Sequence, residues 1–203
     1  MKITVICGSH RPLAQSLKVA RYIRSVLADG ISEETALVSL ADNPLPLWDQ
    51  GVWDKDPKWP PLLDPIRSEL ESSDAFVVVS PEWHGQVPAG LKNFFLLFGR
   101  NELGHKPALI VTVSAGDGGA YPVAELRMSS YKNSRLCYIP EHVIVRHVEQ
   151  VLNEDPAQND VNADEYFRAR IHWALGILRE YGLALQRVRA SGATATDRFH
   201  NGM

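Results

Sequence analysis

The chain has 203 residues, a hydrophobic content of 45% and a formal net charge of −3 at pH 7. This length suits one domain with a sizeable core, and the 21 Lys and Arg residues are scattered, so the basic face of a nucleic-acid-binding protein is not expected. No apolar run approaches the roughly 18 residues of a membrane-spanning helix, and "KITVIC" at the start predicts a strand and not a signal peptide, which favours a cytoplasmic protein without a membrane partner.

Apolar runs of strand length alternate along the chain with segments of helical period. The five predicted strands cover residues 2–7, 35–40, 75–80, 107–114 and 136–145. The first intervening helix repeats apolar residues at Leu17, Ala20, Ile23 and Leu27. The second repeats them at Leu62, Leu63, Ile66 and Leu70. This alternation predicts an α/β fold in which helices flank a parallel sheet.

The connection between the second strand and the second helix, residues 41–64, is unusually long and contains Trp48, Trp53 and Trp59. A loop of this length in a compact domain is more often functional than idle. Its indoles could close over a ligand or pack against another subunit, and they could equally cover the core of their own domain. The sequence leaves these possibilities open.

The C-terminal third predicts one long helix followed by a tail. Asn162 and Glu165 have the spacing of a capping box, and an apolar stripe follows from Phe167 to Leu185. The residues after about Ala190 have little apolar content. We therefore expect a single domain over residues 1–190 and a flexible tail over residues 191–203.

The first strand ends in "CGSHRPLAQSLKVA", where the chain turns through Gly8 and Ser9 toward a helix that starts near Gln15. Ligands of open parallel sheets bind beyond the carboxyl ends of the strands. A helix start offers unpaired N–H groups, to which the hydroxyls of Ser9 and Ser16 and the Arg11 guanidinium add donors. The spacing matches neither G-x-G-x-x-G nor a Walker loop, which favours a terminal monophosphate. An ordinary strand-to-helix turn with an exposed arginine is the alternative.

The exits of the third and fourth strands predict a surface for a flat ring. In "SPEWHGQVPAGLKN" the segment after Pro81 leaves the sheet and exposes peptide groups beside Trp83, because proline cannot donate to a ladder. In "VSAGDGGAYP" three glycines within four positions leave a bare backbone surface. A phosphate at one strand exit and a flat polar ring against the next two describe FMN.

Four segments in order carry a family resemblance: "GSHRPLAQS", "LADNPLPLWDQ", "SPEWHGQVPAGLKN" and "SAGDGGA". Together they resemble the NAD(P)H-dependent FMN reductase family of flavodoxin-like proteins, which includes quinone, azo-dye and chromate reductases. The likeness covers about residues 1–145. It implies a flavodoxin-like three-layer sandwich with a five-stranded parallel sheet of order 2-1-3-4-5. It also implies an enzyme that uses FMN and NADPH or NADH to reduce a small-molecule acceptor, such as free FMN, a quinone, an azo compound or a metal oxyanion.

The resemblance also assigns residues to the cofactor. The FMN phosphate would be held by Ser9, Arg11, Gln15, Ser16 and the backbone of Leu17. The ring system would be bordered by Pro81, Glu82, Trp83, His84 and Gly85. The pyrimidine end would face Ser114, Gly116, Gly118 and Gly119. No catalytic side chain and no metal are expected, because the chemistry belongs to the cofactor and the histidines lack metal-ligand spacing.

The chain departs from the family pattern at Trp83 and His84, where Tyr and Asn are common, and it lacks an Asp that often follows the Leu-Lys-Asn of residues 91–93. Flavin binding is expected to survive these changes, while acceptor preference is left undetermined. His84 could donate to the flavin or to an oxidant, or be an ordinary loop histidine. An electron-carrier flavodoxin and a flavin-free phosphate-binding module are the alternative functions.

The segment "LKNFFLLFGR", residues 91–100, is apolar nearly all round. A helix of this kind needs cover on more than one side, by its own core and by another chain, and burial wholly within one subunit is the alternative. The family resemblance likewise implies homodimers, sometimes paired into homotetramers, with flavin sites near the interface.

Overall fold

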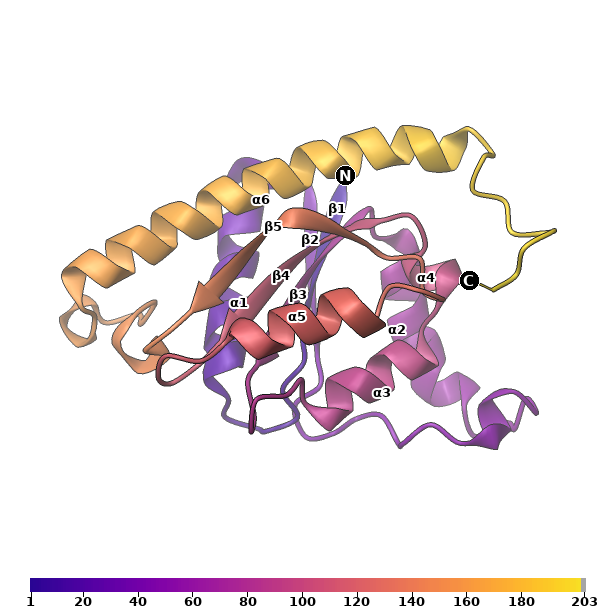
Figure 1. Ribbon diagram of the computed structural model, residues 1–203, viewed down its shortest axis with the longest axis horizontal. Helices are drawn as coiled ribbons and strands as arrows, with labels where there is room; N and C mark the ends of the chain where they lie inside the picture. Colours follow the sequence, from indigo (N-terminus) through magenta and orange to yellow (C-terminus); the bar gives the residue numbers. More distant parts are fainter. Residues whose placement is uncertain (202–203) are drawn as a thin grey trace.

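Five parallel strands form one sheet at the centre of the molecule in the computed structural model, which describes residues 1–201 (Figure 1). The strands are β1 Lys2–Cys7, β2 Glu34–Ser39, β3 Ala75–Pro81, β4 Pro107–Val113 and β5 Cys137–Val145. Their order across the sheet is β2-β1-β3-β4-β5. The predicted flavodoxin-like α/β fold and its strand order are therefore confirmed, and each predicted strand differs from the observed one by at most one residue at either end.

Helices cover both faces of the sheet. The main helices are α1 Gln15–Val26, α2 Pro60–Ser72, α3 Ala89–Leu97, α4 Arg100–Leu103, α5 Ala120–Ser129 and α6 Val161–Ala190. Short helical turns lie at η1 Leu27–Ile31, η2 Gln50–Val52, η3 Val148–Gln150 and η4 Pro156–Gln158. Figure 1 shows α6 along one side of the sheet and α3 and α5 along the other.

The alternation of side chains along each strand explains the two core layers. Ile3, Val5 and Cys7 of β1 face α1 and α6, whereas Ile6 faces the layer of α2 and α3. Strands β3 and β4 are buried at every residue, which is why they read as continuous apolar runs. The edge strand β5 is only partly buried.

The long connection 41–64 ends earlier than predicted, because α2 begins at Pro60. Trp59 is 3% exposed and belongs to the core layer under α2 and α3, so this indole covers its own domain. Trp48 packs edge-to-face against Trp53, which is 69% exposed. The buried Asn93 of α3 fixes the loop: its Oδ1 accepts from Trp48 N at 2.8 Å, and its Nδ2 donates to the carbonyl of residue 46 at 2.8 Å.

The start of α6 corrects one prediction. Asp160, not Asn162, caps the helix, and its Oδ1 accepts from Ala163 N at 2.9 Å. Asn162 therefore lies inside the first turn, and the predicted capping box is wrong. The apolar stripe is confirmed, since Ile171, Ala174, Leu175 and Leu178 are buried.

The chain after α6 turns back toward α4 (Figure 1). The side chain of Arg135 donates to Phe199 O at 2.6 Å, and that of Arg100 donates to His200 O. The flexible tail predicted over residues 191–203 stays a prediction for its described part, and its last two positions lie outside the described residues.

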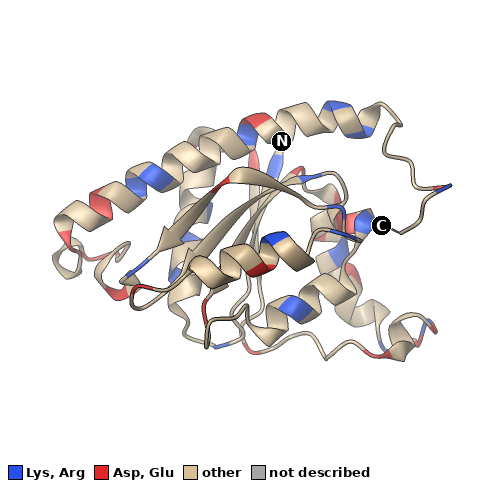
Figure 2. Ribbon diagram, viewed as in Figure 1, with Lys and Arg blue, Asp and Glu red and all other residues tan. Residues whose placement is uncertain are grey.

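Charged side chains are spread over the described part of the chain, with Lys and Arg interspersed among Asp and Glu (Figure 2). None of the helices in residues 1–201 combines the length and the apolar character that crossing a bilayer requires.

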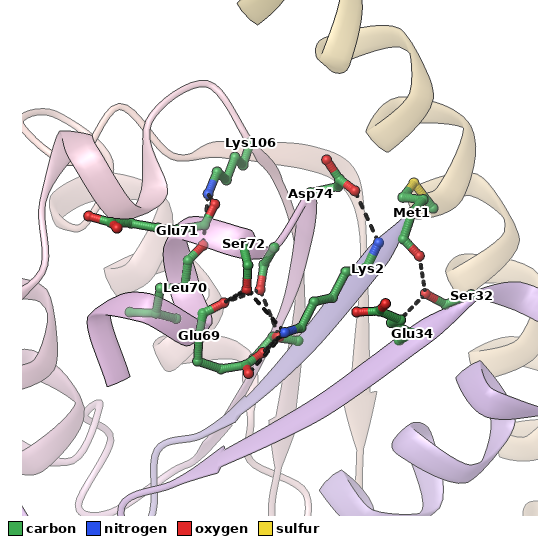
Figure 3. Close-up of polar contacts among 12 residues, drawn as sticks. Met1, Lys2, Ser32, Glu34, Glu69, Leu70, Glu71, Ser72, Asp74 and Lys106 are labelled. Carbon is green, nitrogen blue, oxygen red and sulfur yellow. Dashed lines mark hydrogen bonds and ion pairs between the residues drawn. The ribbon is translucent and has the colours of Figure 1, made fainter. Parts of the chain in front are cut away.

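The amino ends of the strands are tied together by polar contacts (Figure 3). Lys2 N, at the start of β1, donates to Asp74 Oδ2 at 3.0 Å. Lys106, just before β4, donates through Nζ to the carbonyls of Leu70 and Glu71 at 2.7 and 2.9 Å. These contacts hold the last turn of α2 against the sheet.

Candidate functional site

Three turns meet at the carboxyl edge of the sheet, where β1, β3 and β4 end. Gly8 N donates to Val79 O at 2.8 Å, which joins the β1 exit to β3. The rings of His10 and Trp83 pack edge-to-face with centroids 4.7 Å apart, which joins the first turn to the second. Glu82 N donates to Val113 O at 3.0 Å, which joins the second turn to the end of β4. The sequence-based expectation that these exits lie together is thus fulfilled.

The first turn ends in a helix whose N-terminus is uncapped. The N-cap residue of α1 is Ala14, and no side chain of the described residues accepts from the first turn of this helix. Leu17 N donates to Ala14 O at 2.9 Å, so the free amides of this turn are those of Gln15 and Ser16. An uncapped helix start with hydroxyls beside it is a ready anion site.

The hydroxyl groups at this turn are shielded from water. Ser9 and Ser16 are each 1% exposed, whereas Arg11 and Gln15 are exposed. Ser9 Oγ accepts from Arg11 N at 3.3 Å, which bends the chain outward before the helix. The turn therefore combines buried hydroxyls and two free amides with an exposed guanidinium on a long side chain at its rim. This donor set suits a phosphate group.

The second turn is a tight reversal over Trp83, His84, Gly85 and Gln86. Trp83 and Gln86 exchange two backbone hydrogen bonds: Gln86 N donates to Trp83 O at 2.9 Å, and Trp83 N donates to Gln86 O at 3.0 Å. His84 and Gly85 have φ values of 50° and 71°, and positive φ at both central residues is the signature of a type I′ turn. This geometry puts the exposed His84 at the tip and leaves the half-buried Trp83 at the base, beside His10.

The third turn is fastened to the second by a carboxylate. Glu82 Oε2 accepts from Gly119 N at 2.6 Å. Gly119 has a φ of 104°, and a Cβ there would lie 2.4 Å from Ile144 Cγ2, so only glycine fits. A Cβ at Gly118 would lie 2.7 Å from Glu82 Oε1, whereas a Cβ at Gly116 would meet nothing within 4 Å. The turn is therefore close-packed at Gly118 and Gly119 and open at Gly116.

Residues at and after the end of β5 form hydrogen bonds to the third turn. Arg146 Nε donates to the carbonyls of Asp117 and Gly118 at 2.8 and 3.0 Å. His147 Nε2 lies 2.9 Å from Asp117 Oδ1. Ser114 N donates to Val145 O at 2.9 Å, and its hydroxyl accepts from Gly116 N at 3.2 Å. Sequence reasoning did not assign Arg146 and His147, although their position directly after the last strand places them at this edge.

Lys18 is a second residue that sequence reasoning missed. Its Nζ donates to Val148 O at 2.6 Å, to Val151 O at 2.8 Å and to Asn153 Oδ1 at 2.7 Å. Burial, partly offset by nearby carboxylates, holds the pKa of this amine below its ordinary value. These bonds tie α1 to the segment after β5 and hold the first turn in place.

Cys7, at the end of β1, is a structural and not a reactive residue. It is fully buried, and burial raises the pKa of its thiol, so it carries little of the thiolate that reacts. Among residues 1–201, no group of three or more His, Cys, Asp or Glu side chains is placed to hold a metal ion.

The predicted site residues thus fall into three groups at one edge. The first turn holds Ser9, Arg11, Gln15, Ser16 and Leu17. The second holds Pro81, which ends β3, with Glu82, Trp83, His84 and Gly85. The third holds Ser114, Gly116, Gly118 and Gly119. Their predicted contacts to a flavin stay predictions, and Leu17 N differs from expectation in already donating to Ala14 O.

A groove of about 570 Å³ lies beside the first turn, between α1 and the segment around Asn153. Its walls include Leu13, Lys18 and Arg21 but no residue of the second or third turn. The groove is therefore lined by residues of the first turn, among them Gln15 and Leu17, and does not join the three groups of predicted residues.

The chain matches the family model described as NADPH-dependent FMN reductase over residues 1–150. Among curated relatives, the quinone reductase of Escherichia coli K12 is 33% identical over 124 residues, which cover 59% of this chain and 64% of that protein. The NADPH azoreductase of Bacillus sp. OY1-2 is 28% identical over 166 residues, which cover 79% of this chain and 88% of that protein. The match thus spans slightly less than two thirds of the quinone reductase.

Solved structures share the fold. The flavoenzyme NAD(P)H:(acceptor) oxidoreductase FerB of Paracoccus denitrificans superposes with a TM-score of 0.68 at 20% identity, covering 90% of this chain and 97% of that one. An FMN-dependent NADH-azoreductase of Bacillus anthracis, solved in complex with FMN, gives a TM-score of 0.58 at 14% identity and covers 88% and 100% of the two chains. With the family model, the sheet order and the three turns in agreement, the chain belongs to the NADPH-dependent FMN reductase family.

Proposed function

We propose that this protein binds FMN between the three turns and uses NADPH or NADH to reduce a small-molecule acceptor. The observation that carries the proposal is the convergence of an uncapped helix start, an aromatic turn and a glycine turn at one edge of the sheet. Membership of the family and the names of the relatives, quinone reductase and azoreductase, support quinones and azo compounds as acceptors. The cytoplasm is the location we expect.

Each turn has a distinct task in this proposal. Ser9, Ser16 and the free amides of α1 would bind the phosphate, with Arg11 closing over it from the rim. Trp83 and the backbone around Gly118 would border the ring, and the Glu82 bond to Gly119 N would hold these two borders at a fixed separation. Bound FMN supplies the hydride chemistry, so the chain contributes binding, orientation and exclusion of water.

The test is a flavin titration followed by an activity assay. Purified protein mixed with FMN should quench flavin fluorescence with a Kd below about 10 μM. The complex should then oxidise NADPH or NADH when a benzoquinone or an azo dye is added, with parallel double-reciprocal lines for the two substrates. Failure to bind FMN would leave the flavin-free phosphate-binding alternative. FMN binding without turnover of either nicotinamide would favour the electron carrier.

We further propose that the protein forms a homodimer through the face of α3 and α5, and a pair of dimers would make a tetramer. Leu96 on α3 is 65% exposed and Met128 on α5 is 76% exposed. A groove of about 420 Å³ lies between the two helices, lined in part by Phe95 and Leu126. The face adjoins the second turn, because a Cβ on Gly85 would lie 3.9 Å from Tyr121 of α5.

A charge placed on this face should separate the subunits. Leu96→Glu should shift the mass measured by light scattering from that of a dimer to that of a monomer, since an apolar interface cannot accommodate an unpaired carboxylate. The control is Val161→Glu, which places the same charge on an equally exposed apolar residue at the start of α6. A wild-type protein that is monomeric at about 100 μM would overturn the proposal.

A further inference from the structure

A second polar pocket lies at the amino edge of the sheet, the end opposite the three turns. It is about 340 Å³ in volume. Its walls come from α4, from the residues just before β4 and β5, from the end of α6 and from the chain after it. The lining includes Arg100, His105, Arg135, Arg189, Thr194 and Thr196. Figure 2 shows Lys and Arg at α4 and at the end of α6, beside the returning tail.

Positive charge in this pocket exceeds negative charge. Asp74 accepts from Arg189 at 3.1 Å, but it also accepts from Lys2 N, as Figure 3 shows. Glu102, in α4, faces Arg67 at 3.0 Å and caps its own helix. Within residues 1–201, the side chains of Arg100 and Arg135 form no ion pair with a carboxylate and donate only to tail carbonyls.

Two nitrogens of residues that line the pocket have no hydrogen-bond partner among the described residues. They are His105 Nε2 and Arg135 Nε, both buried. Buried polar atoms of side chains are normally paired, so this part of the wall has unused hydrogen-bonding capacity. The residues that carry them have φ values of 55° and 56° and are joined by a bond from His105 N to Arg135 O at 2.9 Å. The fold thus holds both side chains together in a backbone conformation that costs energy.

The positively charged side chains of the pocket also repel one another. Burial and the neighbouring Arg135 and Arg189 keep the pKa of His105 below its ordinary value. A bound anion would relieve this repulsion and would supply the acceptor that the two nitrogens lack.

We infer that this pocket binds a phosphate group, either as inorganic phosphate or as a small phosphate monoester. Three guanidinium groups and two threonine hydroxyls line the pocket, and they provide more hydrogen-bond donors than one carboxylate can accept from. A phosphate dianion has more acceptor oxygens in a tetrahedral arrangement and can therefore pair with more of these donors. Because Arg100 and Arg135 also hold the carbonyls of His200 and Phe199, the anion would bind at the point where the tail joins the domain.

Calorimetry on the FMN-saturated protein tests this inference, because FMN then occupies the phosphate turn of α1. Inorganic phosphate, glycerol phosphate and acetate are titrated in a buffer without other multivalent anions. Phosphate or glycerol phosphate should bind with a Kd below about 1 mM and acetate much more weakly. Tighter binding of glycerol phosphate identifies an ester as the source, and tighter binding of phosphate identifies the free ion. Absence of saturable binding by both overturns the inference.

Substitutions in the pocket test whether the phosphate binds there. Arg135→Gln should weaken phosphate binding by about tenfold or more, and Arg100→Gln provides a second test on the opposite segment of the wall, in α4. Arg24→Gln removes an exposed cation that lines neither this pocket nor the three turns, and it should leave the phosphate affinity unchanged. Equal phosphate affinity in the wild type and in folded Arg135→Gln and Arg100→Gln proteins would overturn the assignment.

Discussion

Arg11 lies at the rim of the first turn, exposed, with its backbone bent outward by the Ser9 hydroxyl. No carboxylate of residues 1–201 forms an ion pair with this guanidinium, which leaves it available to a phosphate at the start of α1. We therefore expect this side chain to contribute in the complex with FMN and not in the free protein. This separates its effect on binding from any effect on folding.

Arg11→Ala should weaken FMN binding by roughly 1 to 3 kcal/mol, because a charge-assisted bond to the phosphate is lost. A fluorescence titration at low salt measures the change. Arg24→Ala, which removes an exposed cation from the last turn of the same helix, is the control and should change the affinity little. Unchanged affinity in the Arg11 variant would remove this residue from the phosphate site.

At the scale of elements, the turn after β4 depends on one hydrogen bond between turns. Glu82 must keep its carboxylate beside Gly119 N, and the space for it exists because residue 118 has no Cβ. Gly116 in the same turn faces open space. Neither glycine has a positive φ, so alanine is compatible with the backbone at both.

Gly118→Ala should therefore lower the free energy of unfolding of the FMN-free protein by about 1 to 3 kcal/mol, through displacement of the Glu82 carboxylate from a partly buried donor. Gly116→Ala is the matched control and should be neutral or stabilising by up to about 1 kcal/mol, since alanine restricts the unfolded chain. Urea unfolding measures both. Equal stability of the two variants would show that the Glu82 bond does not hold the turn.

The sequence predicted those elements whose signal is local. The strands and helices could be predicted from the spacing of apolar residues. The meeting of the three turns could be predicted because the carboxyl ends of parallel strands share one edge. The start of α6 was mispredicted because Asp160 and Asn162 are both good caps, and only the structure decides between them. The bracing of the third turn by Arg146 and the pocket around Arg135 were not predicted, since each joins segments distant in sequence.

At the scale of the whole molecule, a buried amine links the sheet to the last turn of α2. Lys106 is 6% exposed, and its Nζ donates to the carbonyls of Leu70 and Glu71 in the last turn of the helix. The Leu70 carbonyl also accepts from Ser73 N at 3.2 Å. Desolvation, aided by Arg189, lowers the pKa of this amine from 10.5 to about 8, while Asp74, Glu71 and Glu102 oppose the shift. The folded protein therefore holds this charge less readily than the unfolded chain does.

The sign of the pH effect follows from this difference. Below about pH 8 both states carry the proton, and the penalty for burying the charge is fully present. Between about pH 8 and pH 10.5 the unfolded chain binds more protons than the folded one, so this group makes the free energy of unfolding rise with pH. Lys106→Met removes the titration, and Lys132→Met removes an exposed lysine as the control.

Urea unfolding at about pH 7 and about pH 10, in a buffer without phosphate, isolates the effect as a difference between proteins. The wild type should gain about 1 to 3 kcal/mol relative to Lys106→Met over this range, and no such gain should appear relative to Lys132→Met. Groups that titrate equally in all three proteins cancel in the comparison. A gain that is the same for both variants would mean that the amine between α2 and β4 is not held in a desolvated position.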